Sequence, residues 1–292
     1  MFSGVYTALV TPFKKGRLDE ASLKTLIELQ VKGGVDGIVP VGTTGESPTV
    51  DFEEHVRIIE LAVFYAKGRC KIIAGSGANS TEEAVYLTKS AEYAGADGSL
   101  QVSPYYNKPS QDGLYAHFSE IAKSTNLPIV LYSIPGRCNV EIAVPTVARL
   151  AADCPNIVCI KEAGGDADRV SHLRAALPKN FSILSGDDAL TLPFMSVGAQ
   201  GVISVASNLV PKPLSKMVHS YLKGDQKAAL KVHEKYYPLF KDLFIETNPV
   251  PVKAAMAMKG LVNEEYRLPL VKLAPDNRRQ LRATLKATGV IK

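Results

Sequence analysis

Several chemistries are excluded by what this sequence of 292 residues lacks. Its 4 cysteines form no CxxC pair, which predicts reduced thiols in a cytoplasmic protein rather than a disulfide framework. The 5 histidines follow no HExxH or other zinc-binding spacing, so we expect no metal site. A glycine-rich GxGxxG turn is missing as well, which argues against a dinucleotide-binding sheet. We expect no cofactor.

Long apolar segments and clusters of one charge are also missing. No run is long enough to span a membrane, and residues 1–6 lack the basic start of a secretion signal. The formal charge is +5, and the basic residues are scattered along the chain. We therefore expect neither a membrane nor a nucleic acid as partner. Hydrophobic residues make up 46% of the chain, which is enough for a sizeable core.

Short apolar runs alternate with segments in which apolar residues recur at helical spacing. The eight runs are residues 5–10, 37–41, 71–75, 98–102, 129–132, 157–160, 182–184 and 201–205. A strand followed by a helix, repeated along the chain, predicts parallel strands joined by crossover helices. Eight such units predict an α/β fold, a closed (β/α)8 TIM barrel over residues 1–224. A doubly wound open sheet is the alternative.

The strand pattern stops after residue 224. Residues 226–244, 250–259 and 276–287 have helical spacing, and the turns between them contain proline and asparagine. We therefore predict a second part, a small helical C-terminal region over residues 225–292 that packs on the barrel.

Lys161 directly follows the apolar run 157–160. Burial there would disfavour the ammonium form and lower the pKa, leaving free amine to attack a carbonyl. The ordinary alternatives are a side chain that reaches solvent or one that pairs with Glu162. Tyr132 ends the preceding run, so the two residues would lie on neighbouring strands, roughly 5 Å apart.

Alternation along these two strands predicts which side chains share the barrel interior. The side chains expected to point inward with Tyr132 and Lys161 are Val130, Ile157 and Cys159. Those expected to face the helices are Leu131, Val158 and Ile160. Only a β-bulge would change this order.

Three further motifs follow predicted strands, at the end of a barrel where enzymes of this fold carry their function. They are GTTGE at 42–46, PYYNKP at 104–109 and SIPGR at 133–137. Taken singly, they could be a turn or a phosphate-binding loop, a packed tyrosine pair and a surface cation. With Lys161 they supply an amine, hydroxyls for proton transfer and an arginine for a carboxylate. A Schiff-base enzyme acting on a 2-oxo acid needs that set. Asp188, in contrast, reads as a cap of the following helix.

Together these motifs resemble those of the dihydrodipicolinate synthase family, a group of pyruvate-dependent Schiff-base aldolases and lyases. The likeness runs from Gly4 through residues 248–253, which is essentially the whole chain. It implies condensation of pyruvate with L-aspartate 4-semialdehyde to give 4-hydroxy-tetrahydrodipicolinate. That reaction is the first committed step of the diaminopimelate route to lysine.

The resemblance implies a role for each matching residue. Lys161 would form the Schiff base with pyruvate, Tyr132 would shuttle protons, and Thr43 would link two tyrosines in a relay. Tyr106 would act in the site of the neighbouring subunit, which implies at least a dimer, and members are commonly tetramers. The expected substrate contacts are Thr44 for the pyruvate carboxylate, Arg137 for the carboxylate of the aldehyde, and the backbone of Gly186 and Ile203 around pyruvate. The planar fork of Arg137 suits a bidentate contact.

A second site is implied by the same resemblance. Lysine-sensitive members bind L-lysine at the dimer interface, at positions that match Ser47, Pro48, His55, Asn79, Glu83 and Tyr105. Glu83 would pair with a ligand ammonium group, and the expected effect is feedback inhibition. Taken alone, His55 reads as an exposed helix residue. One departure bears on substrate preference: the family often reads Asn-Val-Pro-x-Arg-Thr where this chain has Ser133 to Cys138.

Two other functions remain open at this point. A sister enzyme, an N-acetylneuraminate lyase or a 2-keto-3-deoxy-sugar-acid aldolase, would share the lysine, the tyrosine and a GTTGE-like turn. Arg137 and the YYNKP sequence favour the synthase. A non-catalytic barrel that binds a keto acid is the second alternative, and the intact set of Lys161, Tyr132 and Thr43 argues against it.

Overall fold

Eight parallel strands close into a barrel in the computed structural model, which describes residues 2–292. The strands are β1 (Gly4–Ala8), β4 (Gly37–Val39), β5 (Lys71–Gly75), β6 (Gly98–Val102), β7 (Ile129–Ser133), β8 (Ile157–Glu162), β9 (Ser182–Ser185) and β10 (Gly201–Ser204). The first strand pairs with both β10 and β4, which closes the ring. The predicted (β/α)8 barrel is therefore confirmed, and the open sheet is wrong.

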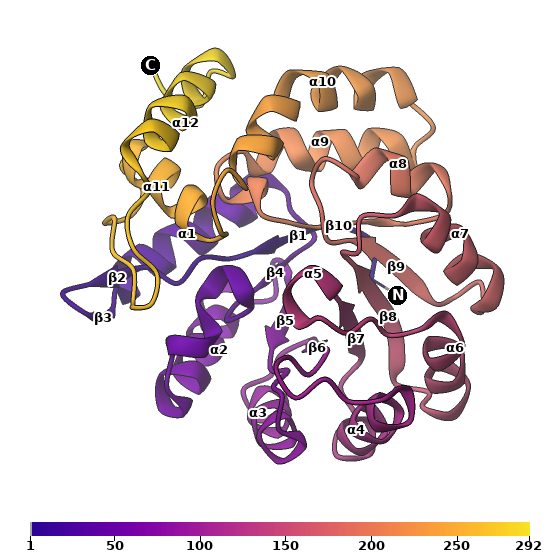
Figure 1. Cartoon of the computed structure of the whole chain (residues 1–292). Coiled ribbons are helices and arrows are strands. Elements are labelled where there is room, and N and C mark those ends of the chain that lie inside the picture. Colours follow the sequence, from indigo (N-terminus) through magenta and orange to yellow (C-terminus); the bar gives the residue numbers. More distant parts are fainter. Residues whose placement is uncertain (1) are drawn as a thin grey trace.

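Helices surround this barrel (Figure 1). They are α1 (Glu20–Gly33), α2 (Phe52–Ala66), α3 (Thr81–Tyr93), α4 (Gln111–Lys123), α6 (Val144–Asp153), α7 (Ala167–Ala176), α8 (Thr191–Ser196) and α9 (Pro211–Leu222). The short helix α5 (Pro135–Cys138) lies inside this ring, next to β7 (Figure 1). Local signals set their ends. The Ser80 side chain accepts a hydrogen bond from the Glu83 amide and starts α3. Gly34, with φ of 73°, ends α1 in the left-handed conformation that glycine adopts without strain.

A β-bulge in β8 changes the predicted alternation at one end of the strand. Ile129 pairs with Ile157 but Val130 pairs with Cys159, so Val158 is an extra residue. From Cys159 onward the prediction is confirmed: Val130, Cys159 and Tyr132 lie in the barrel interior, and Leu131 and Ile160 face the helices. For the two residues before it the prediction is wrong. Ile157 packs toward the helices, and Val158 contacts the interior cluster.

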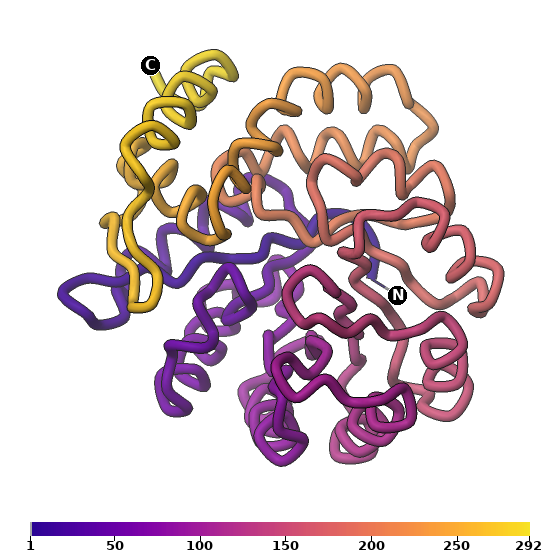
Figure 2. The backbone as a smooth tube through the Cα atoms, viewed as in Figure 1, coloured from indigo at the N-terminus to yellow at the C-terminus, as the bar shows by residue number. Residues whose placement is uncertain are grey.

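Three helices follow the barrel: α10 (Gln226–Asp242), α11 (Val250–Met258) and α12 (Pro275–Ala287). All three were predicted, and α12 packs against the other two. The segment before α12 runs beside a hairpin of β2 (Phe13–Lys14) and β3 (Arg17–Leu18), which was not predicted (Figure 2). There the Lys15 amide donates to the Glu265 carboxylate at 2.9 Å. The segment between α11 and α12 is therefore hydrogen-bonded to the hairpin that follows β1. Among residues 2–292, no helix has the length and apolar character needed to cross a bilayer.

Candidate active site

Lys161 lies in β8 with its side chain inside the barrel, where only 6% of the residue is exposed. Its Nζ lies 4.0 Å from the centre of the Tyr132 ring, and the two residues are register partners on β8 and β7. Both ordinary alternatives are wrong. The amine does not reach solvent, and Glu162 points toward the helices, where its Oε2 accepts a hydrogen bond from Arg169 Nε at 2.9 Å.

The environment of Lys161 favours the free amine. Burial, and to a smaller extent the positive charge of Arg137, lower its pKa to about 7, and the Asp188 carboxylate opposes both effects. Burial also raises the pKa of Tyr132 to about 12, against the influence of Arg137 and of the neighbouring Thr43 hydroxyl. Near neutral pH the site therefore holds an amine that can attack a carbonyl and a phenol that keeps its proton.

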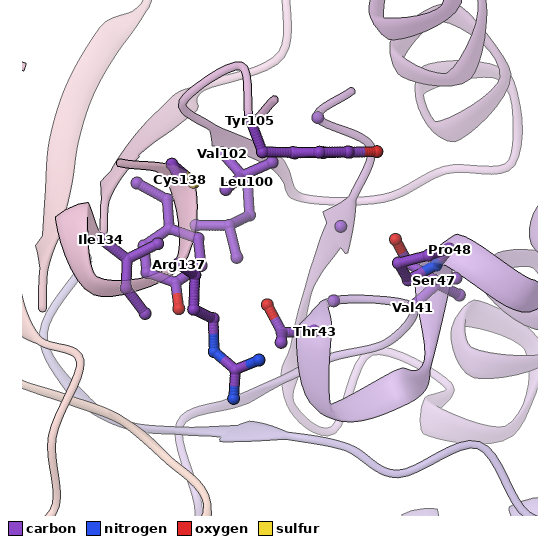
Figure 3. A pocket seen from close by; sticks show the side chains of 14 residues that line it. Val41, Thr43, Ser47, Pro48, Leu100, Val102, Tyr105, Ile134, Arg137 and Cys138 are labelled. Atoms are coloured by element: carbon purple, nitrogen blue, oxygen red, sulfur yellow. The ribbon is translucent and has the colours of Figure 1, made fainter. Parts of the chain in front are cut away.

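A pocket of about 210 Å³ is lined by Tyr132, the neighbour of Lys161, and by Thr43 and Arg137 (Figure 3). Thr43 belongs to the short helix η1 (Thr43–Gly45), which follows β4, and Arg137 belongs to α5, which follows β7. Figure 3 shows the Arg137 guanidinium reaching toward Thr43. Tyr105 of the PYYNKP motif lines the same pocket, so the structure brings together side chains from all three motifs. Cys138 also lines the pocket, and burial raises the pKa of its thiol to about 11.

Of the predicted pyruvate contacts, the structure places Gly186 against Lys161. A Cβ atom built on Gly186 would lie 3.1 Å from Lys161 Cε and 2.5 Å from Ala163 Cβ, so this close approach requires glycine. Ile203 belongs to the interior cluster that contains Tyr132. Thr44 is buried, and its Oγ1 accepts a hydrogen bond from Asn248 Nδ2 at 2.9 Å.

Tyr106 is placed differently from the other predicted catalytic residues. It is 91% exposed, and it does not line the pocket, whereas its neighbour Tyr105 does. Its φ is 71°, a left-handed conformation that is uncommon for a tyrosine. Within one chain, Tyr106 and Lys161 are not brought together.

A second pocket adjoins the first and collects most of the predicted lysine-binding residues. Its lining includes Ser47, Pro48, His55, Glu83 and Tyr105. Asn79 supports its wall, because Asn79 Nδ2 donates to the Tyr105 carbonyl at 3.2 Å. Ser47, Pro48 and Tyr105 line both pockets.

His55 is not the exposed helix residue that its sequence context suggested. It is buried, and its Nε2 lies 2.8 Å from the Gly75 carbonyl oxygen. Burial lowers the pKa of His55 to about 4, so the ring is neutral at physiological pH. Helical spacing could have indicated this burial, because His55 lies one turn before Ile58 and Ile59 on the buried face of α2 and points toward β5.

Asp188 does not cap the helix that follows it, and that prediction is wrong. Asp187 accepts the bonds from the amides of Ala189 and Leu190. The buried Asp188 instead accepts from Ser204 Oγ at 2.5 Å and from the amides of Val205 and Ala206, which ties it to the end of β10. Neither aspartate caps α8, because the helix begins at Thr191 without a side-chain cap and Asp187 closes the turn before it.

The sequence analysis missed a buried ion pair behind the GTTGE turn. Glu46, the last residue of that motif, pairs with Lys253 of α11, and both side chains are buried. The Arg267 amide donates to the other carboxylate oxygen of Glu46 at 3.1 Å. Lys253 lies in the segment that carries the family likeness, but sequence alone offers no signal that joins it to an acid so far away in the chain.

Groups of acidic, histidine and cysteine side chains that could hold a metal ion are not found among residues 2–292.

Comparison with known proteins identifies one family over nearly the whole chain. The model of the dihydrodipicolinate synthetase family matches residues 1–288. The chain is 53% identical over 293 residues to the 4-hydroxy-tetrahydrodipicolinate synthase of Persephonella marina, and the alignment covers all of both chains.

Solved structures of the same family are also similar to this chain. The 4-hydroxy-tetrahydrodipicolinate synthase from the methanotroph Methylacidiphilum fumariolicum SolV superposes with a TM-score of 0.98 at 58% identity, over 99% of this chain and 96% of that one. The enzyme from Cyanidioschyzon merolae, solved with lysine bound, superposes with a TM-score of 0.96 at 41% identity, over 99% of each chain.

Proposed function

This chain belongs to the dihydrodipicolinate synthetase family, and from that premise we propose that it condenses pyruvate with L-aspartate 4-semialdehyde to give 4-hydroxy-tetrahydrodipicolinate. It is a Schiff-base lyase. The observation that carries the proposal is the buried Lys161 amine, whose pKa is lowered to about 7 and which lies against Tyr132 at the mouth of a barrel.

The chemistry follows from these two groups. The Lys161 amine attacks the keto carbon of pyruvate, and the resulting carbinolamine loses water to form an imine. Tyr132 keeps its proton at neutral pH, so it can protonate the departing hydroxyl and later take a proton back. Thr43 lies beside the phenol and extends the path for the proton.

The two substrates each carry a carboxylate, and the structure offers a separate donor for each. Thr44 is buried directly after Thr43, which lines the pocket, and its hydroxyl suits the carboxylate of pyruvate. Arg137 presents a planar guanidinium to the pocket and suits a bidentate contact with the carboxylate of the aldehyde. The backbone around Gly186 and Ile203 would complete the pyruvate pocket.

We infer that Tyr106 completes the proton relay of a neighbouring copy of the chain, which makes the working enzyme at least a dimer and, as a further step, a tetramer. In support, Tyr106 is exposed, lies outside the pocket of its own chain, and has a left-handed backbone conformation that is costly for a tyrosine. Tyr106→Phe mixed with an inactive Lys161→Ala partner would test the exchange, because restored activity in mixed dimers requires a shared site. Mixtures with no more activity than the separate variants would contradict it.

We further infer that the second pocket binds L-lysine and that lysine inhibits the enzyme. The shared wall of Ser47, Pro48 and Tyr105 gives a bound lysine a direct contact with the active site. Glu83 supplies a carboxylate for a ligand ammonium group. The test is activity at millimolar lysine, with Glu83→Gln as the matched variant. An unchanged rate for the unmodified enzyme would rule the inhibition out.

The main proposal is tested by reduction with borohydride in the presence of pyruvate, followed by peptide mapping. We expect added mass on the peptide that contains Lys161. A protein that gains no mass would instead be a keto-acid binder without Schiff-base chemistry. A second assay compares condensation with L-aspartate 4-semialdehyde against cleavage of sialic acid, and faster sialic acid turnover would identify a sister lyase.

A further inference from the structure

Asn248 contacts both residues that are proposed to hold substrate carboxylates. Its side-chain Nδ2 donates to Thr44 Oγ1 at 2.9 Å, and its backbone carbonyl accepts from Arg137 Nη2 at 3.0 Å. Thr44 and Arg137 lie on different elements, η1 and α5, and Asn248 comes from the segment just before α11. With 4% of its surface exposed, Asn248 is shielded from competing solvent. One residue of the C-terminal region therefore joins the two binding groups.

The direction of the bond to Thr44 decides what the threonine can offer a ligand. A hydroxyl group has one proton to donate and accepts through its lone pairs, whereas a carboxylate only accepts. Because the Asn248 amide donates to the Thr44 oxygen, the hydroxyl proton is left for another acceptor. A carboxylate placed in the pocket is the acceptor that this arrangement favours.

We propose that Asn248 is a positioning residue for the proposed reaction: it fixes Thr44 as a hydrogen-bond donor to the pyruvate carboxylate and holds Arg137 in place beside it. The inference rests on the proposed function, since it assigns Asn248 a task only in an enzyme that binds two carboxylates.

Contacts on either side of Pro249 fix the position of Asn248, as a positioning role requires. Its segment is fixed to the GTTGE turn at a second point, where Lys253 pairs with Glu46 in the buried interior. Lys253 lies one turn further along the same segment, and its amide donates to the Pro249 carbonyl at 3.0 Å. Two links, Asn248 to Thr44 and Lys253 to Glu46, thus set the position and the rotation of the segment relative to the turn.

One detail of Asn248 is unfavourable for folding and agrees with a role in the site. Its Oδ1 is buried and has no hydrogen-bond partner among residues 2–292. A buried oxygen without a hydrogen-bond partner destabilises a folded protein, and an alanine at this position would avoid that cost. The benefit of the Asn248 side chain therefore comes from its Nδ2, which donates the hydrogen bond to Thr44.

The test is steady-state kinetics with varied pyruvate on Asn248→Ala, Asn248→Asp, Thr44→Val and the double variant Thr44→Val/Asn248→Ala. For Asn248→Ala we expect the pyruvate KM to rise roughly tenfold with kcat changed much less, as for a lost binding interaction. Asn248→Asp should raise it further, because a carboxylate takes the Thr44 proton and repels the substrate. The double variant should bind pyruvate no more weakly than Thr44→Val alone, since the two residues act through one hydroxyl.

Asn156→Ala is the matched control. Asn156 is another asparagine whose Nδ2 is hydrogen-bonded, to the carbonyls of Ala122 and Thr125, but it lies outside the pocket. It should lower thermal stability and leave the pyruvate KM unchanged. If Asn248→Ala does not fold, Asn248→Ser, whose hydroxyl is too short to reach Thr44, replaces it and carries the same expectation.

Two results would overturn the proposal: an unchanged pyruvate KM in the folded Asn248 variants, or fully additive effects in the double variant. An Asn248→Asp enzyme that binds pyruvate as well as the unmodified one would show that Thr44 is not the donor. Borohydride trapping of the unmodified enzyme separates these results from a failure of the proposed function. If the unmodified enzyme is trapped with pyruvate and the variants behave normally, only the role of Asn248 is wrong.

Discussion

Two lysines are buried among residues 2–292, and their neighbours give them different chemical properties. Lys161 is 6% exposed and Lys253 is fully buried, and burial lowers the pKa of both. Lys253 has the Glu46 carboxylate as an ion-pair partner and sits over the ring of Phe13, with Nζ 4.4 Å from its centre. Lys161 also faces a ring, but a guanidinium is its strongest charged neighbour.

Burial alone therefore does not make a nucleophile. Removing an ammonium group from water costs free energy. An adjacent carboxylate offsets much of that cost, whereas an adjacent cation adds to it. Lys253 has the carboxylate and serves as a structural cation between the GTTGE turn and α11. Lys161 has Arg137, so the proton is held weakly and the free amine becomes accessible near neutral pH.

The largest expected effect is the loss of activity in Lys161→Met. Removing the nucleophile should lower kcat by roughly 10⁴- to 10⁶-fold, as for other enzymes that form covalent intermediates. Stability should not fall, because a poorly solvated amine is replaced by an apolar side chain of similar length. Turnover and mass spectrometry after borohydride reduction measure the first effect, and thermal unfolding measures the second. A pyruvate adduct on another lysine in this variant would break the comparison.

Tyr132→Phe separates two contributions of Tyr132: the ring that buries the Lys161 amine and the phenol that donates a proton. The ring stays against the amine, so its burial is preserved, but the phenol proton is lost. We expect kcat to fall roughly 10²- to 10⁴-fold, the range for a lost general acid–base group. Borohydride trapping of pyruvate should become slower but should still reach Lys161. Near-normal turnover would refute the proton-shuttle role.

Lys253→Met tests the structural member of the pair. It leaves the Glu46 carboxylate buried without its partner, so we expect a loss of about 3–5 kcal/mol in the free energy of unfolding. Lys253→Met/Glu46→Gln should recover much of that loss, because the uncompensated charge is removed. Denaturant unfolding monitored by circular dichroism measures both variants. A double variant as unstable as the single one would mean that packing around Lys253, rather than charge, is what the mutation disturbs.

The comparison also shows which parts of the molecule sequence reasoning could reach. The barrel and the pairing of Tyr132 with Lys161 were predictable, because apolar runs mark buried parallel strands and neighbouring strand ends meet. The bulge at Val158 was not, since it depends on how β8 registers against β7. The Glu46–Lys253 pair and Asn248 were missed for a related reason. Their contacts join residues about 200 positions apart, and no local pattern records such a contact.

The smallest expected effect is a shift in the pH dependence of pyruvate trapping. It tests whether neighbouring charges cause the difference between Lys161 and Lys253. The free amine is the form above the pKa, so the rate of pyruvate trapping should rise about tenfold per pH unit below pH 7 and level off above it. Arg137→Gln removes a positive charge that disfavours the ammonium form, so the pKa of Lys161 should increase and the inflection should move to higher pH. Asp188→Asn removes a charge of the opposite sign and should move it to lower pH. Trapping rates measured with pyruvate alone avoid the proposed role of Arg137 in binding the aldehyde. Shifts in the same direction for both variants would mean that these two charges do not set the pKa of Lys161.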